Sequence, residues 1–161
     1  MSQPRDYRSA SKAASDVVWT TLQPKDSMQP ILAPYVRTFV DSLTGLPVLP
    51  SSVWLIGSKA SGRAQAGSDT DLLVFGSSGF LAAVRAALPQ PSGIDCLVVV
   101  NGNDFEEPWQ DKRGALARWN WVLKSATEAQ YEGTKFIADE PDGTLGQFET
   151  RQERAIRIWP S

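Results

Sequence analysis

The strongest constraint on the fold is a pair of apolar runs separated by polar, turn-forming residues. The first run, residues 53–56, ends in Gly57 and Ser58, and the second, residues 72–75, directly follows the acidic residues 69–71. Runs of this length and composition, bounded by turn residues, are typical of buried β-strands. The sequence therefore predicts two core strands, with a turn after the first that exposes backbone N–H groups and can accept a phosphate.

The two aspartates before the second run are predicted to act together. Side chains of an extended backbone alternate between faces, so Asp69 and Asp71 should point the same way while Thr70 points the opposite way. Two carboxylates aimed at one place repel each other unless a cation lies between them. This spacing favours a metal site at the head of the second strand.

The absence of histidine narrows the kinds of active site that the chain can build. It excludes Ser-His-Asp and Cys-His catalysis, His-ligated zinc and histidine proton shuttles. Carboxylate chemistry remains, and clustered carboxylates select hard cations such as Mg²⁺ or Mn²⁺.

Charge and cysteine content set the expected surroundings of the protein. The chain has 16 basic and 18 acidic residues and a formal charge of −2, so we expect no extended binding to nucleic acid. The one cysteine, Cys96, lies in an apolar run and has no internal disulfide partner, which fits a reducing cytoplasm. No apolar run reaches membrane-spanning length, and residues 1–24 do not have the pattern of an export signal.

The motif resembles the nucleotidyltransferases of the DNA polymerase beta superfamily, especially their small "minimal" members. The family pattern is an apolar strand, Gly-Ser, a spacer and Asp-x-Asp at the head of the next strand, and Gly57, Ser58, Asp69 and Asp71 match it in order. The resemblance covers roughly residues 30 to 100. The chain departs from the family at positions 59 and 61, where it has Lys and Ser in place of a common Arg.

The resemblance implies a fold, which we expect to be α/β (α+β) with a small mixed β-sheet flanked by helices. Residues 1–28 form a polar N-terminal segment with a short helix in this prediction. Residues 29–161 form a single nucleotidyltransferase domain, which is less recognisable from about residue 101.

The resemblance also implies roles for individual residues. Asp95, which heads the apolar run at 96–100, is the expected third acid. The catalytic and metal-binding set is then Asp69, Asp71 and Asp95, holding two Mg²⁺ ions or Mn²⁺. The expected nucleotide- and phosphate-binding residues are Gly57, Ser58, Lys59, Arg63 and Ser68.

The implied reaction is transfer of a nucleoside monophosphate from a triphosphate to an acceptor hydroxyl, with release of pyrophosphate. ATP is the expected donor from its frequency in the family. Many minimal nucleotidyltransferases are antitoxins that modify a partner toxin, whereas others modify tRNA ends or small molecules, and a protein partner is the favoured acceptor here. A non-catalytic module of the same fold that masks a partner is the alternative.

The spacing of apolar residues and the positions of glycine and proline predict further helices and strands. Helices are predicted at 10–22, at 31–43 ending by Gly45, briefly from Ser58, from Ser77 to Leu88, and over 116–126; a third core strand is predicted at 94–100. Residues 135–138 and 144–148 suggest a hairpin around residues 141–143, and residues 149–159 fit either a helix or an extended segment.

Four aromatic residues of the C-terminal part have two interpretations. They could stack nucleotide bases, or they could pack in the core, and the apolar stripe that includes position 119 favours core packing. The four are Trp109, Trp119, Trp121 and Tyr131.

Overall fold

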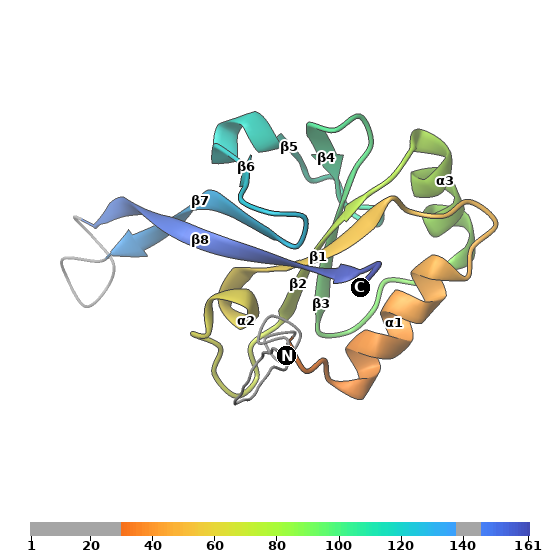
Figure 1. Ribbon diagram of the computed structural model, residues 1–161, viewed down its shortest axis with the longest axis horizontal. Coiled ribbons are helices and arrows are strands. Elements are labelled where there is room, and N and C mark those ends of the chain that lie inside the picture. Colours follow the sequence, from red (N-terminus) through yellow and green to blue (C-terminus); the bar gives the residue numbers. More distant parts are fainter. Residues whose placement is uncertain (1–29, 138–145) are drawn as a thin grey trace, which may run out of the picture. The chain divides into compact units, whose positions relative to one another are not determined.

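One mixed β-sheet of eight strands dominates the computed structural model of the chain (Figure 1). The structure describes residues 30–137 and 146–161. The chain divides into two units, Met1–Ile31 and Leu32–Ser161. All the helices and strands described below belong to the second unit, and the helix predicted at 10–22 lies outside the described residues.

The first seven elements run from α1 to β4. They are α1 (Pro34–Thr44), β1 (Ser52–Ile56), α2 (Gly57–Ser61), β2 (Thr70–Phe75), α3 (Ser78–Ala87), β3 (Ile94–Val99) and β4 (Asp104–Glu106). The C-terminal elements are β5 (Arg113–Ala115), the 3₁₀-helix η3 (Leu116–Trp119), β6 (Val122–Leu123), β7 (Glu128–Ile137) and β8 (Gln147–Trp159).

The strand order is β5-β4-β3-β2-β1-β8-β7-β6. Strands β2 and β3 are parallel, and the other neighbouring pairs are antiparallel. Because α3 connects β2 to β3, this parallel pair has the crossover connection that parallel strands require. The C-terminal strand β8 then pairs with β1 and joins the two halves of the sheet.

The predicted fold class is wrong. The sequence indicated a small sheet flanked by helices, whereas the structure is a mostly β half-barrel of eight strands, and its described residues contain three short α-helices. The elements predicted over residues 31–100 are present. The error comes from the chain after β3, which adds five strands to the sheet.

The helix predicted over 116–126 is the clearest local error. Residues 116–119 form a single 3₁₀ turn, Asn120 adopts φ 52°, and β6 follows. The indole of Trp119 packs on Phe105 and Tyr131, and that of Trp121 packs on Trp54 and Phe75. Because these tertiary contacts outweigh an intrinsic helical tendency, the apolar spacing was misleading here.

The predicted hairpin is present and is longer than expected. Strands β7 and β8 pair in register from Ile137↔Gln147 to Glu128↔Ile156, and Figure 1 shows them as a long two-stranded ribbon. Of the two interpretations of residues 149–159, the extended one is correct. The turn predicted at 141–143 lies outside the described residues.

Helices α1 and α3 cover one face of the sheet. α1 buries Val36, Phe39, Val40 and Leu43, as its helical spacing predicted. α3 begins at the predicted cap, where the Ser77 hydroxyl accepts a hydrogen bond from the Phe80 N–H at 3.0 Å. The core between these helices and the sheet contains Cys96, which is buried and unpaired.

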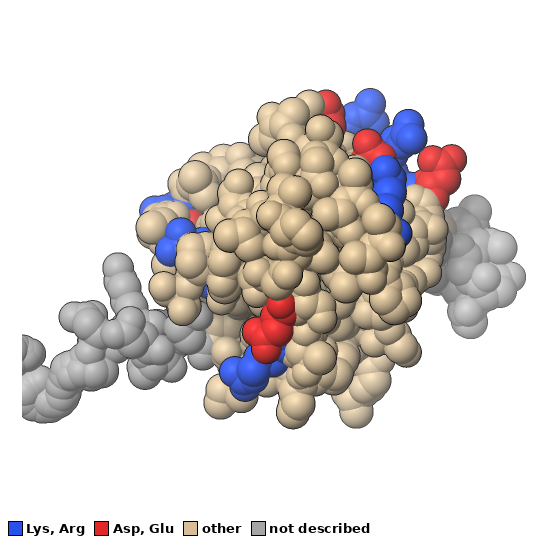
Figure 2. Space-filling model, turned by 90° about the vertical axis from the view of Figure 1, so that its right-hand side faces the viewer, with Lys and Arg blue, Asp and Glu red and all other residues tan. Residues whose placement is uncertain are grey.

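The two sheet faces have separate cores because strand side chains alternate. Leu72, Val74 and Val98 face the helices, and Leu73 and Leu97 face the opposite, aromatic-rich side with Trp54, Phe105 and Tyr131. Figure 2 views the molecule from the side of α1 and α3, where Lys and Arg lie beside Asp and Glu rather than in a continuous basic patch. Among the described residues, no helix has the length and apolar character needed to cross a membrane.

Candidate active site

Asp71 and Asp95 are brought together by the parallel pair of strands. They are direct register partners on β2 and β3. Both lie two residues before core leucines of the aromatic-rich face, Leu73 and Leu97, so both carboxylates point toward that face. Thr70 is buried on the opposite face, as the alternation predicted. The two acids therefore share one side of the sheet, where they line a single cavity of about 510 Å³.

The electrostatics of Asp71 reflect this convergence. Its pKa is raised to about 6, mainly by burial, then by the charge of Asp95 and a side-chain hydrogen bond with Asp95, and least by the charge of Asp69. The charge of Lys112 acts in the opposite direction. The charged form of the Asp71 carboxylate is therefore destabilised, because Lys112 offsets only part of the effect of burial and of the neighbouring acids.

Gly57 lies directly against this carboxylate. It follows β1 with φ +73°, a left-handed conformation that favours glycine. A Cβ atom at this position would collide with the Asp71 side chain. The glycine of the predicted phosphate turn and the second acid of the Asp-x-Asp motif are therefore in close contact.

The first acid, Asp69, is placed differently. It is exposed, precedes β2 and does not line the cavity. Within residues 30–137 and 146–161, no three His, Cys, Asp or Glu side chains form a group ready to hold a metal ion. The predicted triad is consequently a close pair, Asp71 and Asp95, with Asp69 beside it.

Of the five predicted phosphate-binding residues, Gly57 lines the cavity, and the other four, Ser58, Lys59, Arg63 and Ser68, do not. The Lys59 ammonium donates to the Thr70 hydroxyl at 2.9 Å and to the Tyr35 hydroxyl at 3.5 Å. Ser68 closes the loop before β2, because its hydroxyl accepts a hydrogen bond from the Gln65 N–H at 2.9 Å. Ser58, in the first turn of α2, is partly exposed.

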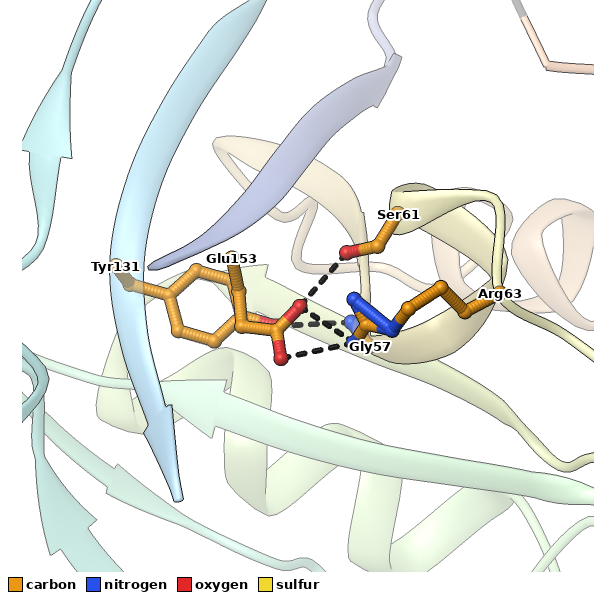
Figure 3. Close-up of polar contacts among 5 residues, drawn as sticks. All are labelled: Gly57, Ser61, Arg63, Tyr131 and Glu153. Atoms are coloured by element: carbon orange, nitrogen blue, oxygen red, sulfur yellow. Dashed lines mark hydrogen bonds and ion pairs between the residues drawn. The ribbon is translucent and has the colours of Figure 1, made fainter. Parts of the chain in front are cut away.

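Arg63 is held by the C-terminal hairpin. Its guanidinium donates to both carboxylate oxygens of Glu153 on β8, at 2.8 and 2.9 Å (Figure 3). The Ser61 hydroxyl donates to the same carboxylate at 2.8 Å. The Glu153 side chain is only 11% exposed, whereas that of Arg63 is 41% exposed. One partly buried carboxylate thus binds the last residue of α2 and a residue just after this helix.

Tyr131 on β7 provides a second contact with the turn. Its hydroxyl accepts a hydrogen bond from the Gly57 N–H at 2.8 Å (Figure 3). Burial raises the pKa of Tyr131 to about 12, so the hydroxyl keeps its proton at neutral pH. The backbone donor that the sequence assigned to phosphate is paired with this tyrosine here.

The cavity also has walls that the motif did not reveal. Glu107, which follows β4, is 5% exposed, lines the cavity and has a buried Oε1 atom with no hydrogen-bond partner among the described residues. The other polar or aromatic lining residues from the C-terminal part include Lys112, Arg118, Trp119, Tyr131 and Glu132. Only the aromatic residues gave a sequence signal, and that signal was interpreted as core packing.

The residues at the cavity suit a hard divalent cation. Asp71 and Asp95 supply carboxylate oxygens, which Mg²⁺ and Mn²⁺ prefer. Burial and the neighbouring acids raise the pKa of Asp71, and the Oε1 atom of Glu107 has no hydrogen-bond partner among the described residues, so a bound cation would stabilise these carboxylates. The oxygen donors of Asp71 and Asp95 are compatible with the predicted cation, and its binding by Asp69, Asp71 and Asp95 stays a prediction.

No protein-family model, curated protein or solved structure matches this chain. The fold and the site define a mostly β protein with a carboxylate pair in a cavity beside a glycine turn.

Proposed function

We propose that the protein is a metal-dependent nucleotidyltransferase. It transfers a nucleoside monophosphate, with ATP as the expected donor, to an acceptor hydroxyl and releases pyrophosphate. The observation that carries this proposal is the register pairing of Asp71 with Asp95 at one cavity, directly against Gly57. The resemblance of the Gly-Ser and Asp-x-Asp motif to the DNA polymerase beta superfamily supports the same function.

Each residue has a role in this proposal. Asp71 and Asp95, with Asp69 beside them, would hold Mg²⁺, which when bound supplies charge neutralisation of the phosphates. Asp95 is exposed and reaches the acceptor side, where it accepts the hydrogen bond of the incoming hydroxyl and orients it toward the α-phosphorus. The oxygen–phosphorus bond to the acceptor forms as the bond to pyrophosphate breaks, and the hydroxyl proton leaves through Asp95 to water.

The turn after β1 positions the leaving group. Gly57 allows the phosphate chain to approach the backbone closely because it has no side chain. Ser58 lies beside it in the first turn of α2 and offers a hydroxyl donor. Arg63 is fixed by Glu153 and so keeps the end of α2 in place.

The proposed acceptor is a hydroxyl of a partner protein, as in antitoxin-type minimal nucleotidyltransferases that modify a toxin. Transfer to a tRNA end or to a small molecule is the alternative acceptor chemistry. A non-catalytic module that masks a partner is the alternative class, and the converging carboxylates argue against it because a scaffold does not need them.

Two measurements test the proposal. Calorimetry with Mg²⁺ and ATP should show metal-dependent binding at millimolar concentrations or below. Incubation of the full chain with labelled nucleoside triphosphates, Mg²⁺ and cell lysate should then label an acceptor, whose identification by mass spectrometry separates protein, tRNA and small-molecule substrates. Absence of any metal-dependent nucleotide binding would contradict the enzyme proposal.

A further inference from the structure

We propose that the same cavity holds the donor's base, stacked on the indole of Trp119. This inference rests on the proposed nucleotidyl transfer and adds a binding subsite for the aromatic part of the nucleotide. Trp119 ends η3, is partly buried and lines the cavity together with Gly57, Asp71 and Asp95. The carboxylates and the indole therefore border one continuous space.

The indole is rigidly supported on the protein side. Its ring lies 4.8 Å from that of Phe105 and 5.3 Å from that of Tyr131, with interplanar angles of 45° and 32°. Such contacts fix the orientation of an aromatic side chain. Trp119 also lines the cavity, where a flat ligand can contact its indole.

Tyr131 connects Trp119 with the phosphate turn. Its ring contacts Trp119, and its hydroxyl binds the Gly57 N–H at 2.8 Å. One tyrosine side chain thus contacts Trp119 through its ring and the phosphate turn through its hydroxyl. In a nucleoside triphosphate, the base and the phosphates lie at opposite ends of the ribose. A molecule with its phosphates at Asp71 would therefore extend its base toward Trp119.

The size and charge of the cavity agree with this occupant. Its volume of about 510 Å³ lies within the range of small-molecule and cofactor sites. Lys112 and Arg118 add two cations to its lining, which suits a ligand that carries phosphates. An apolar ligand would leave these charges and the carboxylates without partners.

The other C-terminal tryptophans do not share this position. Trp109 packs near Phe39 of α1, with ring centroids 6.3 Å apart, and donates its indole N–H to the Leu88 carbonyl at 2.9 Å. Trp121 packs on Trp54, borders a different cavity and also stacks on Tyr131, with ring centroids 6.1 Å apart. Trp109 is therefore the control, because it packs on the helix-covered face of the sheet and does not line this cavity.

The test compares a ligand that has a base with one that has none. Base–aromatic stacking contributes about 1–3 kcal/mol, so Trp119→Leu should weaken Mg²⁺·ATP binding about 5- to 150-fold in calorimetry. Binding of Mg²⁺·inorganic triphosphate should change less than about twofold, and Trp119→Phe should keep most of the ATP affinity. Trp109→Leu should leave both affinities near those of the unchanged protein.

The outcomes separate the two proposals. If Trp119→Leu weakens ATP and triphosphate equally, or neither, the base does not stack on Trp119, while the nucleotidyltransferase proposal stands. If the unchanged protein binds neither ligand, both proposals fail. If the leucine variant does not fold, Trp119→Phe provides the test, because it keeps the ring packing. Loss of the ATP-induced quenching of tryptophan fluorescence in this variant supports stacking on Trp119. Unchanged quenching overturns the proposal.

Discussion

The segment from β1 to β3 and the segment from β4 to β8 contribute different things to one site. The first carries Gly57, Asp71 and Asp95, which are close in sequence and lie on adjacent strands. The second carries Tyr131 and Glu153, which contact the phosphate turn across 74 and more residues of sequence. The groups with chemical roles are thus local in sequence, whereas the groups that hold them in place are distant.

This comparison predicts that changes in the two segments have different consequences. Substitutions at the acids or at Gly57 should alter binding or turnover. Substitutions at the supporting contacts of the C-terminal strands should alter stability first. Four experiments test this difference, in order of decreasing expected effect.

The largest effect is expected for Asp95→Asn. Because Asp95 is proposed to orient the acceptor hydroxyl, its loss should lower turnover about 10²-fold or more and leave most of the affinity for Mg²⁺·ATP. Labelled-nucleotide transfer in lysate measures turnover, and calorimetry measures affinity. Asp41→Asn, on the exposed surface of α1, is the control and should change neither quantity. Full turnover in Asp95→Asn would direct attention to Glu107 as the acid on the acceptor side.

Gly57→Ala should destabilise the protein and displace the Asp71 carboxylate. The left-handed backbone and the collision with Asp71 together should cost about 2–3 kcal/mol of unfolding free energy. Nucleotide affinity should fall as well, because Asp71 must turn away. Gly62→Ala is a matched control: its φ of +77° gives similar strain, but nothing lies within 4 Å of the added carbon. Equal losses in urea denaturation would mean that contact with Asp71 contributes little.

Glu153→Gln should lower the unfolding free energy by about 1–2 kcal/mol. The change weakens charge-assisted hydrogen bonds from Arg63 and Ser61 to a side chain that is 11% exposed. The control is Glu128→Gln on the same hairpin, whose ion pair with Arg154 is 40–41% exposed and should contribute less than about 0.5 kcal/mol. If the two variants are equally stable, Glu153 does not support the turn.

Asp71→Asn should change how stability depends on pH. The folded pKa of about 6 lies above the unfolded value of 3.8, so the folded protein binds more protons between these values, and stability falls as the pH rises through this window. At pH 7.5 without divalent cations, Asp71→Asn should therefore be more stable than the unchanged protein by about 1 kcal/mol, a value reduced for solvent screening.

The difference in stability between Asp71→Asn and the unchanged protein should become small near pH 3.5, where Asp71 is mostly protonated in both states, and it should shrink when millimolar Mg²⁺ is added at pH 7.5. Asp69→Asn is the control for an exposed acid of the same motif. Thermal melting across pH 3.5–8 measures the effect. If Asp71→Asn is no more stable than the unchanged protein at pH 7.5, the charge of Asp71 does not destabilise the folded protein.

The sequence predicted the elements that are determined by local signals. The caps, breakers and apolar spacing of α1 and α3 mark helices, and short apolar runs mark β1, β2 and β3, so all of these were found. Alternation of side chains along β2 also placed Thr70 and Asp71 on opposite faces correctly.

The remaining parts of the fold and of the site depend on contacts between residues far apart in the sequence, which local sequence patterns do not predict. Residues 116–126 have helical spacing, but their tryptophans pack against β1, β4 and β7, and these contacts exist only in the folded sheet. Glu153 lies in a polar segment and gave no signal, since its partners Ser61 and Arg63 are about ninety residues earlier. Glu107 is buried at the cavity because of the course of the chain after β4, which its neighbours in the sequence do not indicate.

The pairing of β8 with β1 has a consequence for the folding rate. Val53 pairs with Trp159, so forming this contact closes a loop of about a hundred residues, which costs chain entropy before any hydrogen bond of the pair is gained. A sheet closed by such distant partners is expected to fold slowly, on the scale of milliseconds to seconds. During synthesis, Gly57 and Ser61 cannot make their contacts with Tyr131 and Glu153 until these strands have left the ribosome, so the site cannot be complete before β7 and β8 are made.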